Sequence, residues 1–327
     1  MKKRKKGAYS LDNISAIFSN KAREKIEANY EIVSDKLLET NASSLATVQV
    51  LFTGWGCPLL TAGLLDRMPK LQAIFHAAGS IRPIIPNDFW GRKITISSAW
   101  SVNAVPVAEF TVSLIFLSLK QVFRLSREMH EIRSRPEIKW IAGGYQSNVG
   151  LVGLGMTGRL VAQKLAKSEV RVFGYDPTLS TEQFKAINVT PLSLEELFET
   201  CDVVSLHAPL IDKTRGMIHR RILEKMVLGA TLINTARGGL IKEQDLVEIL
   251  NKRQDIFAIC DVTDLEPPEL RSPLYTMKNI LLTPHLAGSI GKECWRLGDA
   301  MVAEALRFNA DMSLEYSITE KMYSNMA

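Results

Sequence analysis

The sequence predicts an α/β protein built around a doubly wound parallel sheet. Short apolar runs alternate with amphipathic stretches along most of the 327 residues, a pattern typical of parallel strands linked by helices. Residues 147–176 strengthen the prediction, because they read as strand, Gly-rich turn, helix and strand. Ligands of such sheets collect at the carboxyl ends of the strands.

The Gly-rich turn has the G-x-G-x-x-G spacing of a dinucleotide-binding site. Gly153, Gly155 and Gly158 stand where the apolar run 149–152 turns into a helix, which is the context that the motif requires. The first glycine permits the tight turn, and the second lets the backbone approach a pyrophosphate. The third lets the helix pack closely on the strand. The turn therefore predicts a nucleotide cofactor at the start of this helix.

Asp176 ends the second strand of this unit, residues 170–175. A carboxylate at that place suits a ribose with two free hydroxyls and repels the 2′-phosphate of NADP. The sequence therefore predicts NAD as the cofactor.

The composition excludes several classes of protein. Five of the 40 basic residues lie in residues 2–6, which leaves 35 against 35 acidic residues, so we expect a solvated basic tail and no nucleic-acid partner. The apolar stretch 107–119 contains Glu109 and is too short to span a bilayer, so we expect a buried helix and no membrane. The four cysteines form no CxxC pair and have no histidine at zinc-ligand spacing, which favours reduced thiols, a cytoplasmic location and no metal.

The remaining chain continues the alternation. Before the motif we expect a long helix at 107–125, with Pro106 in its first turn, that links two domains. After the motif, further strands complete a six-stranded doubly wound sheet, and a last helix at 291–309 is free to return to the first domain. The other predicted strands are 46–51, 71–76, 94–97, 203–206, 230–234, 256–261 and 280–283, and the other helices are 61–68, 194–199, 221–226 and 242–251. The residues at the carboxyl ends of strands in the second sheet are Gly153, Asp176, His207, Thr235 to Arg237, Asp261 and His285.

Five motifs in a fixed order resemble the NAD-dependent D-isomer specific 2-hydroxyacid dehydrogenases. They are VGLVGLGMTG (149–158), HAPL (207–210) with Thr214, INTARGGLI (233–241), DVTDLEP (261–267) and TPHLAGS (283–289). The resemblance covers nearly the whole chain after the basic tail. It implies a Rossmann domain, residues 103–289, inserted in a smaller flavodoxin-like α/β substrate domain, residues 1–102 and 290–327. It also implies an active site in the cleft between them and a homodimer formed through the cofactor domains.

The resemblance assigns catalysis to Arg237, Glu266 and His285. Each alone has a plain structural interpretation: a surface cation, a loop acid and a strand-end histidine. Together they suit the reduction of a 2-oxo acid, in which the carbonyl carbon receives a hydride and its oxygen a proton. His285 would supply the proton, and Glu266 would stabilise the protonated imidazole. Arg237 would hold the substrate carboxylate or carbonyl.

The other site residues also follow from the resemblance. Backbone N–H groups near Ala78 and Gly79 would bind the substrate carboxylate together with Arg237. Asp261 and Thr235 would lie by the nicotinamide, and Thr214 and Pro209 along the cofactor. The full cofactor set is Gly153, Gly155, Met156, Thr157, Gly158, Asp176, Pro177, Ala208, Pro209, Thr214, Thr235, Ala236, Asp261 and Ala287.

Two residues depart from the family where the substrate is selected. Arg82 lies where many members carry an acid and an amide, and Trp100 where a small or proline-containing turn is usual. Trp100 is either an apolar wall of the substrate pocket or a hinge residue that packs in the interior. Arg82 either holds a second polar end of the substrate or is solvated.

The predicted activity is hydride transfer between NAD(H) and a small 2-oxo or 2-hydroxy acid, of the glyoxylate or hydroxypyruvate type. Two alternatives stay open. One is a relative that oxidises formate or phosphite. The other is an NAD-sensing regulator that keeps this fold and these residues.

Overall fold

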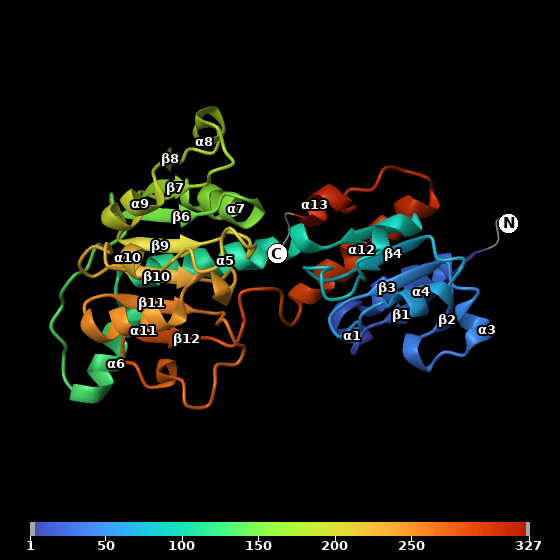
Figure 1. The fold of residues 1–327 in the computed structure, drawn as a ribbon, viewed down its shortest axis with the longest axis horizontal. Helices are drawn as coiled ribbons and strands as arrows, with labels where there is room; N and C mark the ends of the chain where they lie inside the picture. Colours follow the sequence, from blue (N-terminus) through green and yellow to red (C-terminus); the bar gives the residue numbers. More distant parts are fainter. Residues whose placement is uncertain (1–3, 325–327) are drawn as a thin grey trace. The chain divides into compact units, whose positions relative to one another are not determined.

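The computed structural model describes residues 4–324, which form two compact α/β units (Figure 1). Unit 1 contains the residues up to Asn103 together with those from Ser289 onward, and unit 2 is Ala104–Gly288. The chain therefore leaves unit 1, completes unit 2 without interruption and returns to unit 1.

Unit 1 is built on a five-stranded parallel sheet with the strand order β2-β1-β3-β4-β5. Hydrophobic side chains cover both of its faces, and β3 and β4 are buried along their whole lengths. The strands are β1 (Lys5–Ser10), β2 (Tyr30–Ser34), β3 (Val50–Thr53), β4 (Ala73–His76) and β5 (Thr95–Ser98). The helices are α1 (Ile14–Ile17), α2 (Asn20–Asn29), α3 (Ala42–Leu45), α4 (Ala62–Asp66), α12 (Glu293–Asn309) and α13 (Glu320–Ser324), with 3₁₀ turns at Leu37–Glu39 and Phe89–Arg92.

The prediction of a solvated basic tail is wrong for Lys5 and Lys6, and Lys2 and Lys3 lie outside the described residues. Lys5 and Lys6 begin β1, an interior strand that pairs with both β2 and β3. The strand is set by the buried residues that follow, from Gly7 to Ser10. Lys6 keeps its ammonium group at the surface, 3.6 Å from Glu31, because a lysine stem is long enough to reach solvent.

Unit 2 is built on a seven-stranded parallel sheet with the order β12-β11-β10-β9-β6-β7-β8. The six predicted strands are present, and β8 is added at the edge; its two residues are too few to give a sequence pattern. The strands are β6 (Asn148–Val152), β7 (Arg171–Tyr175), β8 (Thr190–Pro191), β9 (Val203–Leu206), β10 (Thr231–Asn234), β11 (Phe257–Cys260) and β12 (Ile280–Leu282). The helices are α7 (Met156–Leu165), α8 (Thr181–Ala186), α9 (Leu194–Thr200), α10 (Arg220–Leu223) and α11 (Glu243–Lys252), with 3₁₀ turns at Gly238–Leu240 and Pro273–Tyr275.

The predicted helix 107–125 is two helices, α5 (Trp100–Leu119) and α6 (Val122–Ile132). Pro106 lies inside α5 rather than in its first turn. The break is at Gln121, which takes a left-handed φ of 53° while its Nε2 donates to the carbonyl of Gly229 at 2.6 Å. A tertiary hydrogen bond thus overrides the continuous apolar pattern.

Among residues 4–324, α5 alone is long and apolar enough to cross a membrane. Its apolar character has another cause in this fold, because Leu114, Ile115 and Leu119 pack into the core that covers one face of the unit 2 sheet.

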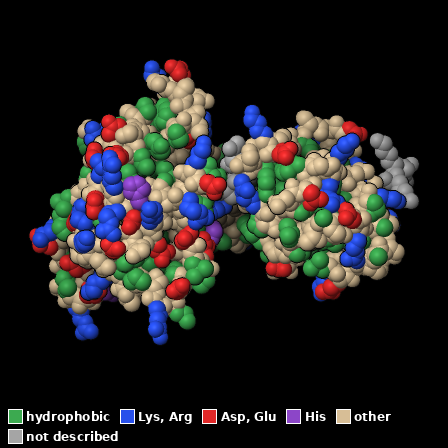
Figure 2. All heavy atoms as spheres, in the orientation of Figure 1, with side chains coloured by type: hydrophobic (Ala, Val, Ile, Leu, Met, Phe, Trp, Pro, Cys, Tyr) green, Lys and Arg blue, Asp and Glu red, His purple; other side chains and the backbone are tan. Residues whose placement is uncertain are grey.

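The surface carries both charge signs. Lys and Arg side chains are interspersed with Asp and Glu on the face drawn in Figure 2. All four cysteines are buried and free. In the described part of the chain, no group of three or more His, Cys, Asp or Glu side chains could hold a metal ion.

Candidate active site

His285 follows β12 in a left-handed backbone conformation, with a φ of 57°. This conformation is unfavourable for a residue with a side chain, so neighbouring groups must hold it. The His285 N–H lies 2.9 Å from the carbonyl of Asp261 and 3.0 Å from that of Thr283. The imidazole is thereby directed by the end of the adjacent strand, β11.

The buried carboxylate of Asp261 fixes the loop on both sides of His285. Its Oδ1 accepts from the Thr283 hydroxyl at 2.6 Å and from the Leu286 N–H at 2.7 Å. Its Oδ2 accepts from the Ala287 N–H at 2.9 Å. Two predicted cofactor residues, Asp261 and Ala287, are therefore partners in holding the histidine loop.

His285 and Glu266 form a close pair, with Nδ1 of the imidazole 2.7 Å from Oε2 of the carboxylate. Their side chains are 51% and 39% exposed, so the pair lies at an accessible surface of unit 2. Because Nδ1 faces Glu266, Nε2 is the nitrogen left to meet a ligand.

Arg237 lies in the turn that follows β10, and Asn234 stabilises this turn. The Asn234 amide donates to the Arg237 carbonyl at 2.9 Å and accepts from the Ala236 N–H at 3.1 Å. Burial lowers the pKa of Arg237 from its ordinary value, and the charge of Glu266 opposes that shift. Glu266 therefore interacts with both His285 and Arg237, and the structure brings the three predicted residues together within unit 2.

Gly238 lets the turn of Arg237 approach the segment that leads to Glu266. A Cβ at this position would lie 1.9 Å from the backbone carbon of Thr263 and 2.1 Å from its oxygen. Only glycine permits this approach between the turn of Arg237 and the segment that leads to Glu266.

The three glycines of the dinucleotide motif have different surroundings. Gly153 has a φ of 91°, and a Cβ there would lie 2.6 Å from the Ala208 nitrogen. A Cβ at Gly158 would lie 2.1 Å from the Gly153 oxygen. At Gly155, in contrast, a Cβ would meet nothing within 4 Å. Protein packing explains the first and third glycines, whereas the second leaves open space of the kind that a pyrophosphate needs.

The start of α7 fits the same ligand. Met156 and Thr157 open the helix, and Gly155 precedes them without a side chain to cap the first N–H groups. These N–H groups and the positive end of the helix dipole suit a phosphate. The residues present therefore fit the NAD that the sequence predicts.

Asp176 follows β7 and contacts the Gly-rich turn directly. Its Oδ2 accepts from the Leu154 N–H at 2.8 Å, and its Oδ1 accepts from the Thr178 N–H at 2.9 Å and the Thr178 hydroxyl at 2.6 Å. A carboxylate offers about four acceptor sites, so the side chain can still accept from a ribose hydroxyl. Pro177, the next residue, is exposed.

Two predicted cofactor threonines are hydrogen-bonded within unit 2. The Thr214 hydroxyl donates to the Pro209 carbonyl at 2.5 Å and accepts from the Ile211 N–H at 2.9 Å, closing the turn after β9. The Thr235 hydroxyl is buried 2.9 Å from the Thr111 hydroxyl of α5. Both side chains shape the loops at the carboxyl ends of the strands.

His207 follows β9 and lies beside the Gly-rich turn. Burial lowers its pKa to about 4, so the ring is neutral near neutral pH. Its Nε2 is buried and has no hydrogen-bond partner within residues 4–324.

The segment Ala78–Gly79 lies after β4 in unit 1. The Ser98 hydroxyl is 3.0 Å from the carbonyl oxygen of Ala78 and 2.6 Å from that of Gly79. A Cβ at Gly79 would lie 3.5 Å from Nδ2 of Asn103. Sequence reasoning missed Asn103, although a lone amide among the apolar residues of α5 was a usable signal. Its Oδ1 accepts from the Ser289 N–H at 2.9 Å, which turns the amide nitrogen away from Ser289.

Trp100 and Arg82, the two residues that depart from the family, both contact other residues of unit 1. Trp100 begins α5 and packs, partly buried, against a hydrophobic core of this unit, as the interior interpretation expects. The Arg82 guanidinium lies 4.7 Å from the centre of the Tyr323 ring and donates to the Tyr323 carbonyl at 2.9 Å. Arg82 therefore binds α13.

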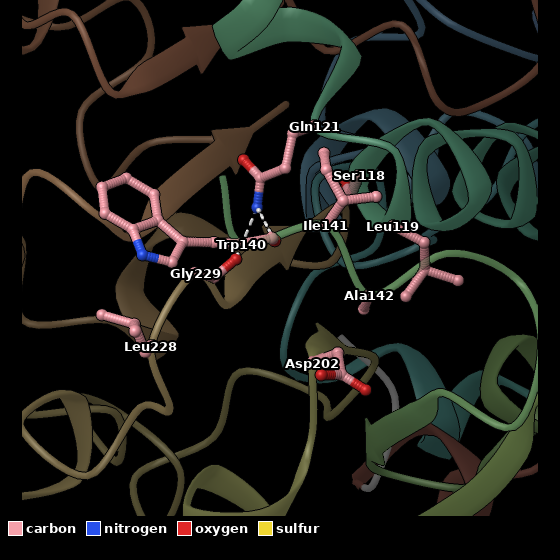
Figure 3. A pocket seen from close by; sticks show the side chains of 9 residues that line it. All are labelled: Ser118, Leu119, Gln121, Trp140, Ile141, Ala142, Asp202, Leu228 and Gly229. Carbon is pink, nitrogen blue, oxygen red and sulfur yellow. Dashed lines mark hydrogen bonds between the residues drawn. The ribbon is translucent and has the colours of Figure 1, made fainter. Parts of the chain in front are cut away.

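A cavity of about 240 Å³ lies elsewhere in unit 2 (Figure 3). Asp202 and Gly229, which line it, precede β9 and β10. The cavity is thus at the amino ends of these strands, and no predicted site residue lines it. Its walls are Ser118, Leu119, Gln121, Trp140, Ile141, Ala142, Asp202, Leu228 and Gly229.

Sequence comparison identifies the family. The profile described as the NAD binding domain of D-isomer specific 2-hydroxyacid dehydrogenases matches residues 112–287, more than half of the chain. The chain belongs to this family. The matched residues lie within unit 2, so unit 2 contains the NAD-binding domain and the close pair of His285 and Glu266.

Individual relatives agree with this membership. The D-3-phosphoglycerate dehydrogenase of Bacillus subtilis is 28% identical over 252 residues, which are 76% of this chain and 47% of that protein. The chain thus spans about half the length of the curated relatives it matches.

Solved structures share the fold. A phosphoglycerate oxidoreductase from Rhizobium etli has a TM-score of 0.81 at 20% identity, over 97% of this chain and 99% of that chain. The NAD-complexed D-isomer specific 2-hydroxyacid dehydrogenase from Lactobacillus delbrueckii ssp. bulgaricus has a TM-score of 0.80 at 20% identity, over 96% and 100%.

Proposed function

We propose that this protein transfers a hydride between NAD(H) and a small 2-oxo or 2-hydroxy acid. The observation that carries the proposal is the 2.7 Å contact between His285 and Glu266, which lies beside Arg237 at the carboxyl ends of strands in an NAD-binding domain. Proton donor, charge partner and anion binder are the groups that this reduction needs.

Each residue has a defined task in this mechanism. His285 donates a proton from Nε2 to the carbonyl oxygen as the alcohol forms, and accepts it in the reverse direction. Glu266 stabilises the charged imidazole and holds the ring by Nδ1. Arg237 holds the substrate carboxylate or carbonyl with its planar fork. NADH, when bound, would supply the hydride for the carbonyl carbon.

The geometry of the Gly-rich turn supports the proposed cofactor residues. The open space at Gly155 and the N–H groups at the start of α7 accept the pyrophosphate. Asp176 accepts from the ribose hydroxyls and excludes a 2′-phosphate, which favours NAD over NADP. Thr235, Ala236, Pro209 and Thr214 shape the loops along the rest of the cofactor.

The substrate is a small anionic acid of the glyoxylate or hydroxypyruvate type, whose carboxylate Arg237 binds. The test is loss of NADH absorbance on mixing with glyoxylate, hydroxypyruvate or pyruvate. D-3-phosphoglycerate with NAD belongs in the panel because the relatives carry that name. Turnover of one of these substrates supports the proposal. Tight NADH binding without turnover of any of them would favour an NAD-sensing regulator instead.

We also propose a cytoplasmic homodimer formed through unit 2. The support is α6, which has no buried residue, although Val122, Met129 and Ile132 on it are apolar and 38%, 56% and 49% exposed. A second copy of the chain would cover them. Analytical ultracentrifugation should give twice the 36.5 kDa of the chain. Met129→Glu should give the monomer, whereas Leu270→Glu, at a residue 98% exposed in a loop, should not.

A further inference from the structure

The cavity at the amino ends of β9 and β10 is enclosed by separate segments of unit 2 (Figure 3). Gln121 lies between α5 and α6, Trp140 follows α6, and Gly229 precedes β10. The Gln121 amide joins these segments, because its Nε2 donates to the Gly229 carbonyl at 2.6 Å and to the Trp140 carbonyl at 3.4 Å. The walls of this cavity of about 240 Å³ are therefore tied to one another.

Asp202 supplies the cavity with a negative charge. Its Oδ2 accepts from the Asn148 N–H at 2.7 Å, which orients the carboxylate. Within residues 4–324 its Oδ1 accepts no hydrogen bond. None of the described residues that line the cavity is a lysine, an arginine or a histidine. The carboxylate thus faces the cavity without a cationic partner.

Two side chains near this carboxylate also have an oxygen without a partner. The Ser118 Oγ, on a residue that lines the cavity, and the Asn148 Oδ1 are buried and make no hydrogen bond within the described part of the chain. Amide and carboxylate oxygens only accept hydrogen bonds, and a hydroxyl oxygen can accept them too. This side of the cavity therefore has more acceptors than donors, which suits a ligand rich in N–H groups.

The rest of the cavity is largely apolar. Leu119, Ile141 and Ala142 line it, together with Trp140 and Leu228, which are 37% and 65% exposed. In Figure 3 the Trp140 ring and the Leu228 side chain lie to the left, away from Asp202 at the bottom. Exposed apolar side chains that gather around a cavity are typical of binding sites.

Arg124 determines which end of a ligand belongs at the indole. Its guanidinium lies 5.2 Å from the centre of the Trp140 ring and does not line the cavity. Its positive charge, paired with Glu128 at 3.3 Å, repels an ammonium group from the same ring. The positive end of a ligand therefore belongs at Asp202, and an uncharged end belongs at Trp140.

We propose that this cavity binds a small primary amine, whose ammonium group pairs with the Asp202 carboxylate and whose hydrocarbon body packs against Trp140 and Leu228. The bond at Oδ1 is a charge-assisted hydrogen bond. The site lies at the opposite end of the strands from the Gly-rich turn and from the pair of His285 and Glu266. It does not depend on the proposed function.

Three probes with the same hydrocarbon body separate charge from shape: cyclohexylmethylamine, cyclohexylmethanol and cyclohexanecarboxylate. Calorimetric titration at neutral pH should give a Kd for the amine lower than that for the alcohol by about tenfold or more, as expected for a hydrogen bond between charged groups. The carboxylate should not bind. Added salt should weaken binding of the amine more than that of the alcohol. Equal Kd values for the amine and the alcohol would overturn the proposal.

Three variants assign the contacts. Asp202→Asn keeps an oxygen for the Asn148 N–H and removes the charge, so the Kd for the amine should rise to that for the alcohol. Leu228→Ala, at an exposed position, should weaken both probes by the same factor. Glu169→Gln changes an exposed carboxylate before β7 that does not line the cavity, and it should change neither Kd. All three variants should bind NADH like the wild type. A preference for the amine that survives in Asp202→Asn would contradict the assignment.

NMR spectra of the wild-type protein locate the amine without any variant. Added cyclohexylmethylamine should shift the amide signals of Ala142 and Gly229, which line the cavity, and leave that of Gly155 in the Gly-rich turn unchanged. Shifts confined to Gly155 would place the amine elsewhere and overturn the proposal. If none of the three probes binds, the cavity holds only water and the proposal is equally wrong.

Discussion

At the scale of single residues, His285 is held by Glu266 at Nδ1 of its ring and by the carbonyls of Asp261 and Thr283 at its backbone N–H. His285→Ala should lower kcat by about 10² to 10⁴-fold, the usual contribution of a general acid, and leave the Kd for NADH nearly unchanged. Stopped-flow measurement of NADH consumption and fluorescence titration of NADH separate the two effects. The control is His130→Ala on α6, whose ring binds the Ser126 carbonyl; it should change neither. A wild-type kcat in His285→Ala would remove this residue from the mechanism.

Asp176 permits a test of cofactor selection because its carboxylate has two separable properties, a negative charge and an oxygen that accepts from the Leu154 N–H. Asp176→Asn removes the charge but keeps an oxygen for the Leu154 N–H, whereas Asp176→Ala removes both. Both variants should move the ratio of kcat/KM values toward NADP, because the repulsion of the 2′-phosphate is lost. Only Asp176→Ala should also loosen the Gly-rich turn and weaken both cofactors. An unchanged ratio of kcat/KM values in both variants means that Asp176 does not select between NAD and NADP.

How far the sequence could predict the site depends on the kind of residue. Arg237, Glu266 and His285 stand in motifs with a fixed order, and the structure brings them together. The hydrogen bonds of Asp261 and Ser98 could not be predicted, because they go to groups far away in the chain. Ser98, for example, meets Gly79 across a strand pair. A sequence shows which side chains are present but not which carbonyl each one faces.

At the scale of elements, Gly238 lets the turn after β10 lie directly against the backbone of Thr263 in the loop after β11. Gly238→Ala should lower the free energy of unfolding by about 3 kcal/mol or more, because the new methyl group overlaps the Thr263 backbone and neither side can move cheaply. It should also reduce kcat, since the segment that carries Glu266 must shift. Urea unfolding and steady-state kinetics measure the two effects. Gly63→Ala in α4, where a Cβ meets nothing within 4 Å, is the matched control and should be neutral or slightly stabilising. Equal stability in the two variants would contradict the overlap.

The contact between Arg82 and α13 gives a second prediction at this scale. Arg82→Ala should release α13, which becomes sensitive to limited proteolysis near Tyr323, while the order of preference among 2-oxo acids stays the same. The reason is that Arg82 is bound to the Tyr323 ring and carbonyl. A changed ranking of glyoxylate against two bulkier 2-oxo acids would return Arg82 to the substrate site.

Trp100→Ala should lower kcat/KM for all three substrates together, because this side chain packs in a core.

The elements that the sequence missed have physical reasons in common. β1 begins with two lysines, β8 has two residues, and the end of α5 is set by the bond from Gln121 to Gly229. Periodicity detects long elements with a repeated apolar pattern, such as α7 and α12. It does not detect a strand whose first residues reach solvent by their long stems, or a helix that a distant carbonyl ends.

At the scale of the whole molecule, each unit contains a buried neutral histidine. Burial lowers the pKa values of His76 and His207 from 6.5 to about 4. Between these pH values the unfolded chain binds protons that the folded chain does not, so the free energy of unfolding should fall as the pH falls from about 6.5 toward 4. Each residue contributes at most about 1.4 kcal/mol per pH unit.

Urea unfolding midpoints at a series of pH values test this linkage. His76→Gln should flatten the decline relative to wild type, and His130→Gln, at a solvent-exposed position, should not. A slope in His76→Gln as steep as that of wild type would show that His76 does not take part in the acid sensitivity.

Unit 1 is formed by two separate stretches of the chain. This affects the order in which the two units can fold during synthesis on the ribosome. The Tyr30 hydroxyl donates to the Ala305 carbonyl at 2.7 Å, and the carbonyl of Ile96 accepts from the Ile318 N–H at 2.8 Å. Neither bond can form until the later partner has left the exit tunnel, whereas unit 2 is one continuous stretch. We expect nascent chains stalled beyond residue 288 to carry a protease-resistant NAD-binding domain while the first hundred residues are still digestible. During synthesis the N-terminal segment therefore stays unfolded until the C-terminal residues emerge. In this interval its apolar side chains are most accessible to chaperones.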